Sequence, residues 1–182
     1  MTIRCLHLLT ICAAVMALGS TAVRADEAGP LSDFQQPMAD GVTVAGALHA
    51  DAFARLPAGT RVIDLRSAEE GTSESAAAAA ERGVDYHNVP VPGAAIDPSA
   101  VAEVARLIGE AGGAPVLLHC ASGNRAGMIW GAVQVRRGAA LDDVRERLAA
   151  VPMRPAAEEA LAAFAESCAA AAEGCPAGTP AP

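Results

Sequence analysis

Residues 116–127 read VLLHCASGNRAG and are followed by MIWGAV at 128–133. The segment is a short apolar run, then a cysteine with a turn of small polar residues, then a run that is apolar on every side. This order predicts a buried strand, a tight loop and a buried helix. Cys120 lies where loop N–H groups and the positive end of the helix dipole converge, which favours its thiolate and a bound anion.

Arg125 and Gly123 complete the predicted anion site. The guanidinium of Arg125 is permanently charged, and its planar fork matches phosphate or sulfur oxyanions. Gly123 allows the backbone to turn tightly enough to direct N–H groups inward. A single cysteine is more often a small buried apolar residue, but a cysteine and an arginine at a strand–helix junction favour a nucleophile in an anion cradle.

The rest of the chain alternates predicted strands and helices. Strands are expected at 42–45, 61–66, 84–91 and 115–119, and helices at 51–56, 72–83, 97–112, 124–137, 141–148 and 156–173. Such alternation predicts an α/β fold with a mostly parallel sheet that has helices on both faces. A chain of 182 residues is long enough for one domain with one core.

Four segments, taken in order, resemble one protein family. They are VTVAG at 42–46, VIDLR at 62–66, NVPVPG at 88–93 and HCASGNR at 119–125. They are similar to the phosphatase-like domain of the beta-lactamase hydrolase-like proteins, over about residues 40–148. The loop by itself also resembles those of cysteine-dependent phosphatases and of rhodanese sulfurtransferases. The resemblance implies a cysteine phosphatase/rhodanese-like fold.

The resemblance also implies roles for the loop. Cys120 would be the nucleophile, carrying a phosphocysteine or a persulfide, and Arg125 would clamp the oxyanion. The backbone of four residues would complete the cradle: Ala121, Ser122, Gly123 and Asn124. In-line attack on a phosphate ester divides one displacement into two, the second by water, and the loop amides with Arg125 would meet the charge on the transferred group. No cofactor is expected.

Two features differ from the tyrosine-phosphatase pattern. Four residues separate Cys120 from Arg125, the length usual in rhodaneses, where tyrosine phosphatases have five. Ala126 stands where phosphatases commonly carry a Ser or Thr that assists departure of the thiolate. Three functions therefore stay open: a phosphatase acting on a phosphorylated small molecule or protein side chain, a sulfurtransferase with a sulfane-sulfur donor and a thiol acceptor, and a non-catalytic anion- or phosphate-binding module. The phosphatase is the leading prediction.

Four further residues are candidates for supporting roles. Asp97 precedes a proline and fits either a general acid for the leaving oxygen or the N-cap of the next helix. Asp64 and Arg66 end a strand at the carboxyl edge of the sheet, where sites of such folds gather, so Arg66 is a candidate for substrate binding. His119 points to the other side of its strand from the cysteine, which favours support of the loop over direct catalysis.

The N-terminus has the pattern of an export signal. Arg4 supplies a positive charge, residues 8–18 form a short apolar run, and Val23-Arg24-Ala25 resembles a cleavage site. We expect a signal peptide at 1–25, a tether at 26–39, the catalytic domain with its C-terminal helices at 40–173, and a disordered tail at 174–182. The predicted location is periplasmic or secreted, with no stable membrane association after cleavage.

The remaining cysteines and the overall charge bear on three further properties: a disulfide, a metal site and nucleic-acid binding. Cleavage would leave Cys120, Cys168 and Cys175, of which the last two could pair in an oxidising compartment, although Cys168 could equally pack as an apolar residue. No His/Cys/Asp cluster has metal-ligand spacing, so no metal is expected. With 21 acidic residues against 13 basic ones and no basic stripe, nucleic acid is not an expected partner.

Overall fold

The computed structural model of the chain describes residues 29–171 and residue 175. Five strands form one sheet in the order β1-β2-β5-β3-β4. They are β1 (Gln35–Pro37), β2 (Val42–Ala45), β3 (Arg61–Asp64), β4 (Asp85–Asn88) and β5 (Val116–His119). Strands β2, β5, β3 and β4 are mutually parallel, and β1 is antiparallel to β2. The predicted α/β fold with a mostly parallel sheet is confirmed.

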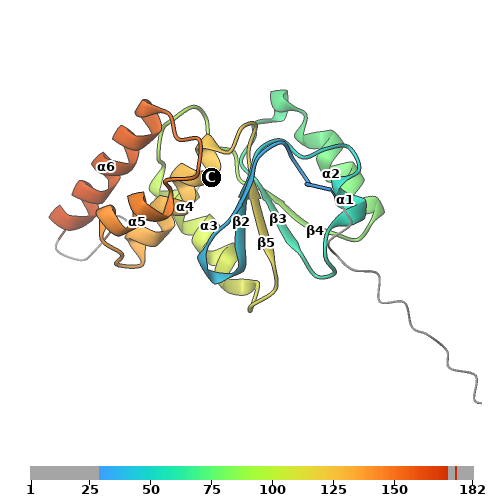
Figure 1. Ribbon diagram of the computed structural model, residues 1–182, viewed down its shortest axis with the longest axis horizontal. Coiled ribbons are helices and arrows are strands. Elements are labelled where there is room, and N and C mark those ends of the chain that lie inside the picture. The colour runs from blue at the N-terminus through green and yellow to red at the C-terminus, as the bar shows by residue number, and fades with distance from the viewer. Residues whose placement is uncertain (1–28, 172–174, 176–182) are drawn as a thin grey trace, which may run out of the picture.

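Helices cover both faces of this sheet. They are α1 (Ala52–Arg55), α2 (Thr72–Glu81), α3 (Pro98–Glu110), α4 (Asn124–Arg136), α5 (Leu141–Arg147) and α6 (Pro155–Ala170), with two short 3-10 turns, η1 (Ala39–Gly41) and η2 (Ala68–Glu70). Helices α1 and α2 lie on one side of the sheet and α3 to α6 on the other (Figure 1). The strands therefore contribute side chains to two hydrophobic cores, one on each face of the sheet. Leu118 of β5 packs in the larger core with Trp130 of α4, and Leu117 packs in the smaller core with Phe53 of α1.

The expected tether at 26–39 is wrong for much of its described part. Residues 35–37 form β1, and Ser32 makes an isolated bridge to Leu48. Gln35, Gln36 and Pro37 are exposed or half-buried, so they lack the apolar alternation by which a strand is recognised in a sequence. Backbone pairing with β2 holds this edge strand in place. The expected signal peptide, and the expected tail apart from Cys175, lie outside the described residues.

Helix α4 is buried along almost its whole length, as its sequence predicts. The chain after α4 approaches this helix closely at two glycines: the segment between α5 and α6 does so at Gly127, and α5 and α6 themselves at Gly131. A Cβ at Gly131 would lie 2.9 Å from Leu161 of α6 and 3.1 Å from Leu148, which follows α5. The absence of a side chain at these positions sets how tightly the last helices pack against the helix that carries Arg125.

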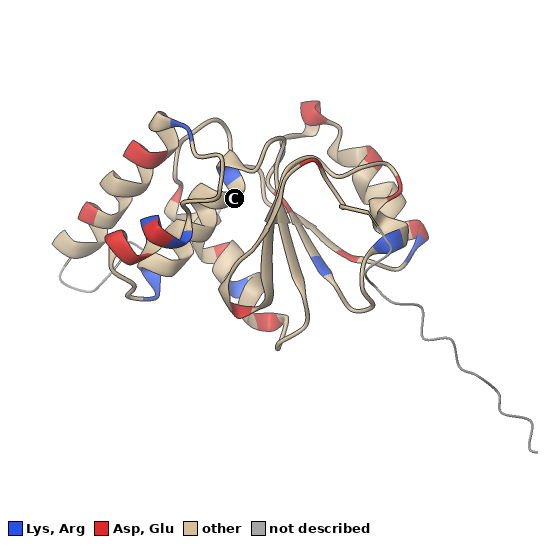
Figure 2. Ribbon diagram, viewed as in Figure 1, with Lys and Arg blue, Asp and Glu red and all other residues tan. Residues whose placement is uncertain are grey.

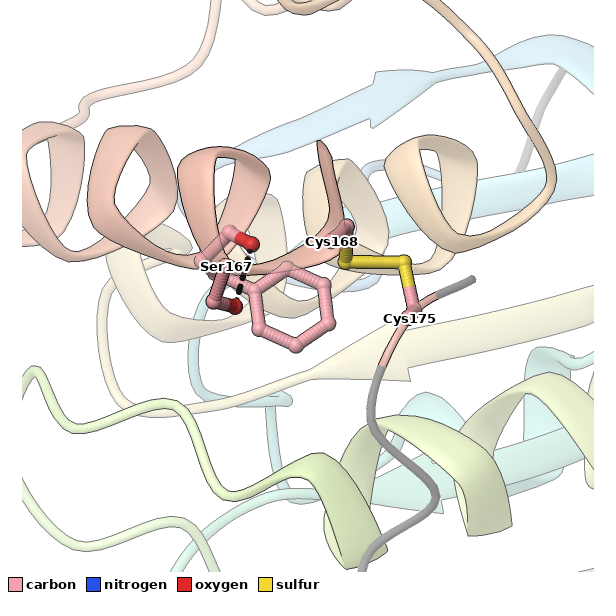
Figure 3. The surroundings of a disulfide bond; sticks show 4 residues. Ser167, Cys168 and Cys175 are labelled. Carbon is pink, nitrogen blue, oxygen red and sulfur yellow. Dashed lines mark hydrogen bonds between the residues drawn. A yellow bond between two sulfur atoms is a disulfide. The ribbon is translucent and has the colours of Figure 1, made fainter. Parts of the chain in front are cut away.

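The disulfide left open by the sequence is formed. Cys168 in the last turn of α6 is bonded to Cys175, and the hydroxyl of Ser167 donates to the carbonyl of Phe164 at 2.7 Å (Figure 3). Cys120 is a free cysteine and is buried. The bond fastens the segment after α6 to the end of the helix.

Charged residues are spread over the helices on both sides of the sheet (Figure 2). In the part of the chain that the structure describes, no helix is long and apolar enough to cross a membrane. That part also contains no group of three or more His, Cys, Asp or Glu residues arranged to hold a metal ion.

We predict that Gly131→Ala lowers the free energy of unfolding by about 1 kcal/mol, because overpacking costs about 1–3 kcal/mol and exceeds the gain of about 1 kcal/mol in helix propensity. Gly109→Ala in α3 is the matched control, since a Cβ there meets nothing within 4 Å. It is expected to stabilise the protein by about 0.5–1 kcal/mol. Urea unfolding measures both changes, and stabilisation by both substitutions would contradict the close packing of α4.

Candidate active site

The loop between β5 and α4 forms the floor of the candidate site. Cys120 follows β5 directly and is only 1% exposed. Its Sγ accepts a hydrogen bond of 3.2 Å from the N–H of Gly123. Gly123 has a φ of +89°, and a Cβ there would lie 2.5 Å from the ring of Phe34. Both the backbone angle and the space require glycine at this turn.

Backbone hydrogen bonds fix the loop to the sheet. The N–H of Cys120 donates to the carbonyl of Ala45 at 3.2 Å, and the N–H of Ala47 donates to the carbonyl of Ala121 at 3.1 Å. Ala45 is the last residue of β2, which is the parallel neighbour of β5. The position of the sulfur is therefore set by the sheet itself.

Five backbone N–H groups around the loop have no acceptor among the described residues. They belong to Ala121, Ser122, Asn124, Arg125 and Ala126. Because α4 begins at Asn124, three of the five are N–H groups that a helix start leaves unpaired. Such groups, together with the positive end of the helix dipole, bind anions. The backbone geometry is that of an anion cradle with the sulfur of Cys120 at its base.

Arg125 is held by a bidentate ion pair with Glu70. Its Nη1 donates to Oε2 of Glu70 at 2.8 Å, and its Nη2 donates to Oε1 at 2.5 Å. Nη1 also donates to the carbonyl of Val91 at 3.1 Å. The hydrogen bond from Arg125 lowers the pKa of Glu70 to about 2. In turn, the hydrogen bond to Glu70 raises the pKa of Arg125 against the opposing effect of burial.

The sequence pattern did not identify Glu70 as a functional residue. Glu70 ends η2, and its Oε2 also accepts the N–H of Ser67 at 2.9 Å. A serine followed three residues later by a glutamate is a capping-box pattern, which predicts a helix start. It does not predict a partner for an arginine 55 residues further along the chain.

A cavity of about 530 Å³ is lined by the loop and its neighbours. Four of the sequence-predicted residues meet there: Ala121, Ser122, Asn124 and Arg125. Glu70 joins them from η2, and Arg154 joins them from the start of α6. The volume falls in the range of small-molecule sites. Cys120 and Gly123 lie beneath the loop surface, where both are buried.

The structure does not bring Arg66 to this cavity. Its guanidinium donates to both carboxylate oxygens of Asp64, to the hydroxyl of Ser75 at 2.7 Å and to the carbonyl of Glu70 at 3.2 Å. Asp64 is fully buried; burial raises the pKa of its carboxyl group, but the interactions with Arg66, His119 and Tyr86 together outweigh this, and the net pKa is lowered. Because Arg66 holds the backbone of Glu70, the contacts place it in support of the ion pair and not against a substrate.

Asp97 also lies away from the cavity that Arg125 lines. Its carboxylate accepts the N–H of Ser99 at 2.8 Å and caps α3. It lines a separate cavity of about 750 Å³ with His87 and Arg106. Of the two roles open from the sequence, the N-cap is the one that the structure shows.

His119 is the last residue of β5 and, by strand alternation, lies on the same face as Leu117, which packs in the smaller core. It is fully buried, and its Nε2 lies 3.5 Å from Oδ2 of Asp64. Burial lowers the pKa of His119 to about 4, although the Asp64 carboxylate opposes this shift. The residue is therefore neutral at ordinary pH and supports the end of the strand from which Cys120 follows.

This burial predicts a pH-dependent stability. Between pH 6.5 and about 4 the histidine is protonated in the unfolded chain but not in the folded one, so the free energy of unfolding falls as the pH falls. His119→Asn removes this contribution, which is about 2 kcal/mol between pH 7 and pH 5. Denaturant unfolding at several pH values measures the slope. His87→Asn, at a partly exposed position, is the control and keeps the wild-type slope; an unchanged slope in His119→Asn would contradict the buried neutral histidine.

Three comparisons place this geometry among known proteins. The solved structure of PTPMT1 in complex with PI(5)P is 16% identical, covers 74% of this chain and 96% of its own, and has a TM-score of 0.59. A DUF442 protein from Shewanella putrefaciens CN-32 is 19% identical, with 73% and 87% covered and a TM-score of 0.59. A protein from Neisseria meningitidis z2491 is 26% identical, with 66% and 91% covered and a TM-score of 0.56. These likenesses show a shared phosphatase-like fold.

The family assignment comes from the sequence comparison. No curated protein matches the chain. The family described as "Beta-lactamase hydrolase-like protein, phosphatase-like domain" matches residues 38–137, which is more than half of the chain and includes β2, the cysteine loop and α4. The chain therefore belongs to the phosphatase-like domain family of the beta-lactamase hydrolase-like proteins.

Proposed function

We propose that the chain is a cysteine-dependent phosphatase that cleaves a phosphate ester through a phosphocysteine on Cys120. One observation carries the proposal: Cys120 lies in a loop whose N–H groups are left without acceptors among the described residues, and Arg125 of the same loop lines the cavity above it. Family and fold are phosphatase-like, and this arrangement adds a nucleophile with an oxyanion site. In many such sites, fixed N–H dipoles that face the charge developing on the substrate make the largest contribution to stabilising the transition state.

The proposed reaction has two displacements. The thiolate of Cys120 attacks phosphorus, so that a sulfur–phosphorus bond forms as the bond to the ester oxygen breaks, and the leaving alkoxide takes a proton from water. Water then attacks the phosphocysteine, which releases inorganic phosphate and restores the thiolate. Glu70 occupies Nη1 and one N–H of Nη2 of Arg125. The remaining edge, formed by Nε and the second N–H of Nη2, is the part that can clamp the phosphoryl oxygens.

The proposed substrate is a phosphorylated small molecule or protein side chain. The complex of PTPMT1 with PI(5)P supports a phosphorylated ligand for a fold of this kind. We also propose that the protein is exported to a periplasmic or extracellular location. The disulfide between Cys168 and Cys175 supports export, because such bonds persist in oxidising compartments.

Sulfur transfer is the second candidate, favoured by two observations. The loop has four residues between Cys120 and Arg125, which makes a smaller ring of amides than a tyrosine-phosphatase loop. In addition, Asp97 caps α3 and does not line the cavity with Arg125. A persulfide on Cys120 needs no acid for a leaving oxygen.

One experiment separates these functions. The full chain is offered p-nitrophenyl phosphate and, separately, thiosulfate with cyanide, and p-nitrophenol and thiocyanate are measured. We expect p-nitrophenol release that falls at least about a thousandfold in Cys120→Ser, since the nucleophile is lost. Thiocyanate without p-nitrophenol would instead assign sulfur transfer. Retained phosphate binding with neither product would assign the non-catalytic module.

We further predict that Glu70→Gln lowers kcat/KM for p-nitrophenyl phosphate by about 10- to 100-fold, because Arg125 loses the charge-assisted bidentate contact that orients it. The carboxylate of Glu70, with its pKa lowered to about 2, stabilises the fold above about pH 4.5, and this contribution is lost as the pH falls through 2. As the pH falls from about 4.5 to 2, the free energy of unfolding of Glu70→Gln therefore decreases less than that of the wild type. Glu69→Gln, at the exposed neighbouring position, is the control; equal effects of both substitutions would refute a specific role for Glu70.

A further inference from the structure

A second arginine, Arg154, lines the same cavity as Arg125 and has no part in the reaction described above. It is the N-cap residue of α6, on the segment that connects α5 to α6. The cavity is thus lined by arginines from two separate elements, the first turn of α4 and the start of α6. The reacting phosphate already has the loop amides and Arg125, so the second guanidinium requires another explanation.

The backbone of Arg154 is fixed beside the cradle. Its N–H donates to Oδ1 of Asn124 at 2.7 Å, and Asn124 is itself buried directly before Arg125. The next residue, Pro155, restricts Arg154 to extended backbone, and the observed φ of −92° and ψ of 152° are extended. A long side chain that starts from a fixed backbone loses less entropy when it binds a ligand.

Arg154 is exposed, and no acidic residue in the part of the chain that the structure describes neutralises its guanidinium. No ion pair there includes it. The acid of the cavity, Glu70, is bound by Arg125. The acid one helical turn further along α6, Glu158, lines a different cavity together with Arg145. Among residues 29–171 and residue 175, Arg154 is therefore a positively charged residue of the cavity lining without an acidic partner.

The other lining residues limit what the ligand can be. Gly93, Ala94, Ala156 and Ala157 leave an open space, and none of the described residues around the cavity is aromatic. The cavity therefore offers no aromatic side chain on which a nucleobase or another ring could stack. A polar, non-aromatic body that carries two anionic groups fits this lining, and the volume of about 530 Å³ accommodates a molecule of sugar size.

We propose that Arg154 determines substrate specificity by binding a second phosphate group, so that the substrate class is a polyol or sugar that carries two phosphates, free or as a lipid headgroup. The inference rests on the proposed phosphatase function. In this arrangement the loop amides and Arg125 hold the phosphate that reacts. Arg154 holds the phosphate that stays, through its planar fork. It contacts the substrate without touching the reacting atoms.

The test compares a matched pair of substrates, myo-inositol 1-phosphate and myo-inositol 1,4-bisphosphate, by release of inorganic phosphate. Arg154→Ala in the full chain is expected to lower kcat/KM for the bisphosphate by about 10- to 100-fold, the loss of a hydrogen bond to a charged group. Its effect on the monophosphate is expected to stay within about threefold. Arg154→Lys, which keeps the charge without the fork, falls between the wild type and Arg154→Ala.

Arg145→Ala is the matched control, because it removes an exposed arginine of α5 that lines another cavity. It is expected to leave both substrates unchanged, which separates a local contact from a general change in charge. Phosphatidylinositol 4-phosphate in phosphatidylcholine vesicles tests the lipid source. Dependence on Arg154 in the vesicles assigns a headgroup, and dependence with the soluble bisphosphate alone assigns a free ligand.

A binding measurement keeps this proposal separate from the phosphatase proposal. In a Cys120→Ser background, calorimetry gives the Kd of each inositol phosphate with and without Arg154→Ala. If no substrate is turned over, the phosphatase proposal fails, yet tighter binding of the bisphosphate that depends on Arg154 still supports the second phosphate site. An equal effect of Arg154→Ala on both ligands, or no effect on either, overturns it.

Discussion

The ion pair between Glu70 and Arg125 joins the two parts of the chain that build the site. Glu70 follows β3 and Arg125 lies in the first turn of α4, which follows β5, and β3 and β5 are neighbours in the sheet. The parallel order of these strands brings their carboxyl ends to one edge, as in other open α/β sheets. There the carboxylate meets the guanidinium in a bidentate contact that leaves one edge of the arginine for an anion. The geometry of the oxyanion site follows from this pair.

A second set of polar contacts, centred on the buried carboxylate of Asp64, supports the ion pair between Glu70 and Arg125. Arg66 binds the buried carboxylate of Asp64 and also holds the carbonyl of Glu70. Tyr86 donates its hydroxyl to the same carboxylate at 2.8 Å. A buried carboxylate with several charge-assisted partners is stable only in a narrow set of positions. This network therefore fixes the turn that carries Glu70, and through Glu70 it fixes Arg125.

The cavity combines N–H groups that bind many anions with side chains that can select one substrate. Unpaired N–H groups at a loop and a helix start bind almost any tetrahedral anion, so they do not select a substrate. Selection must come from other residues that line the cavity, and one of these is Arg154 at the start of α6. Helix α6 reaches the cavity because Gly127 and Gly131 allow the elements after α4 to pack closely. The same helix, α4, thus determines how the last helices pack and which of their residues line the cavity.

The strand, loop and helix around Cys120 could be predicted from the amino-acid sequence, because the change from an apolar run to a turn and back to an apolar run is a local pattern. The same holds for the α/β class and the N-cap option at Asp97. The contacts between distant residues could be seen only in the folded chain: Glu70 pairs with Arg125, Arg154 bonds to Asn124, and Asp97 caps α3 away from the cysteine loop. The tertiary structure also placed β1, whose exposed residues carry no apolar alternation. These outcomes depend on the order of strands in the sheet and on close helix packing, which no spacing along the chain encodes.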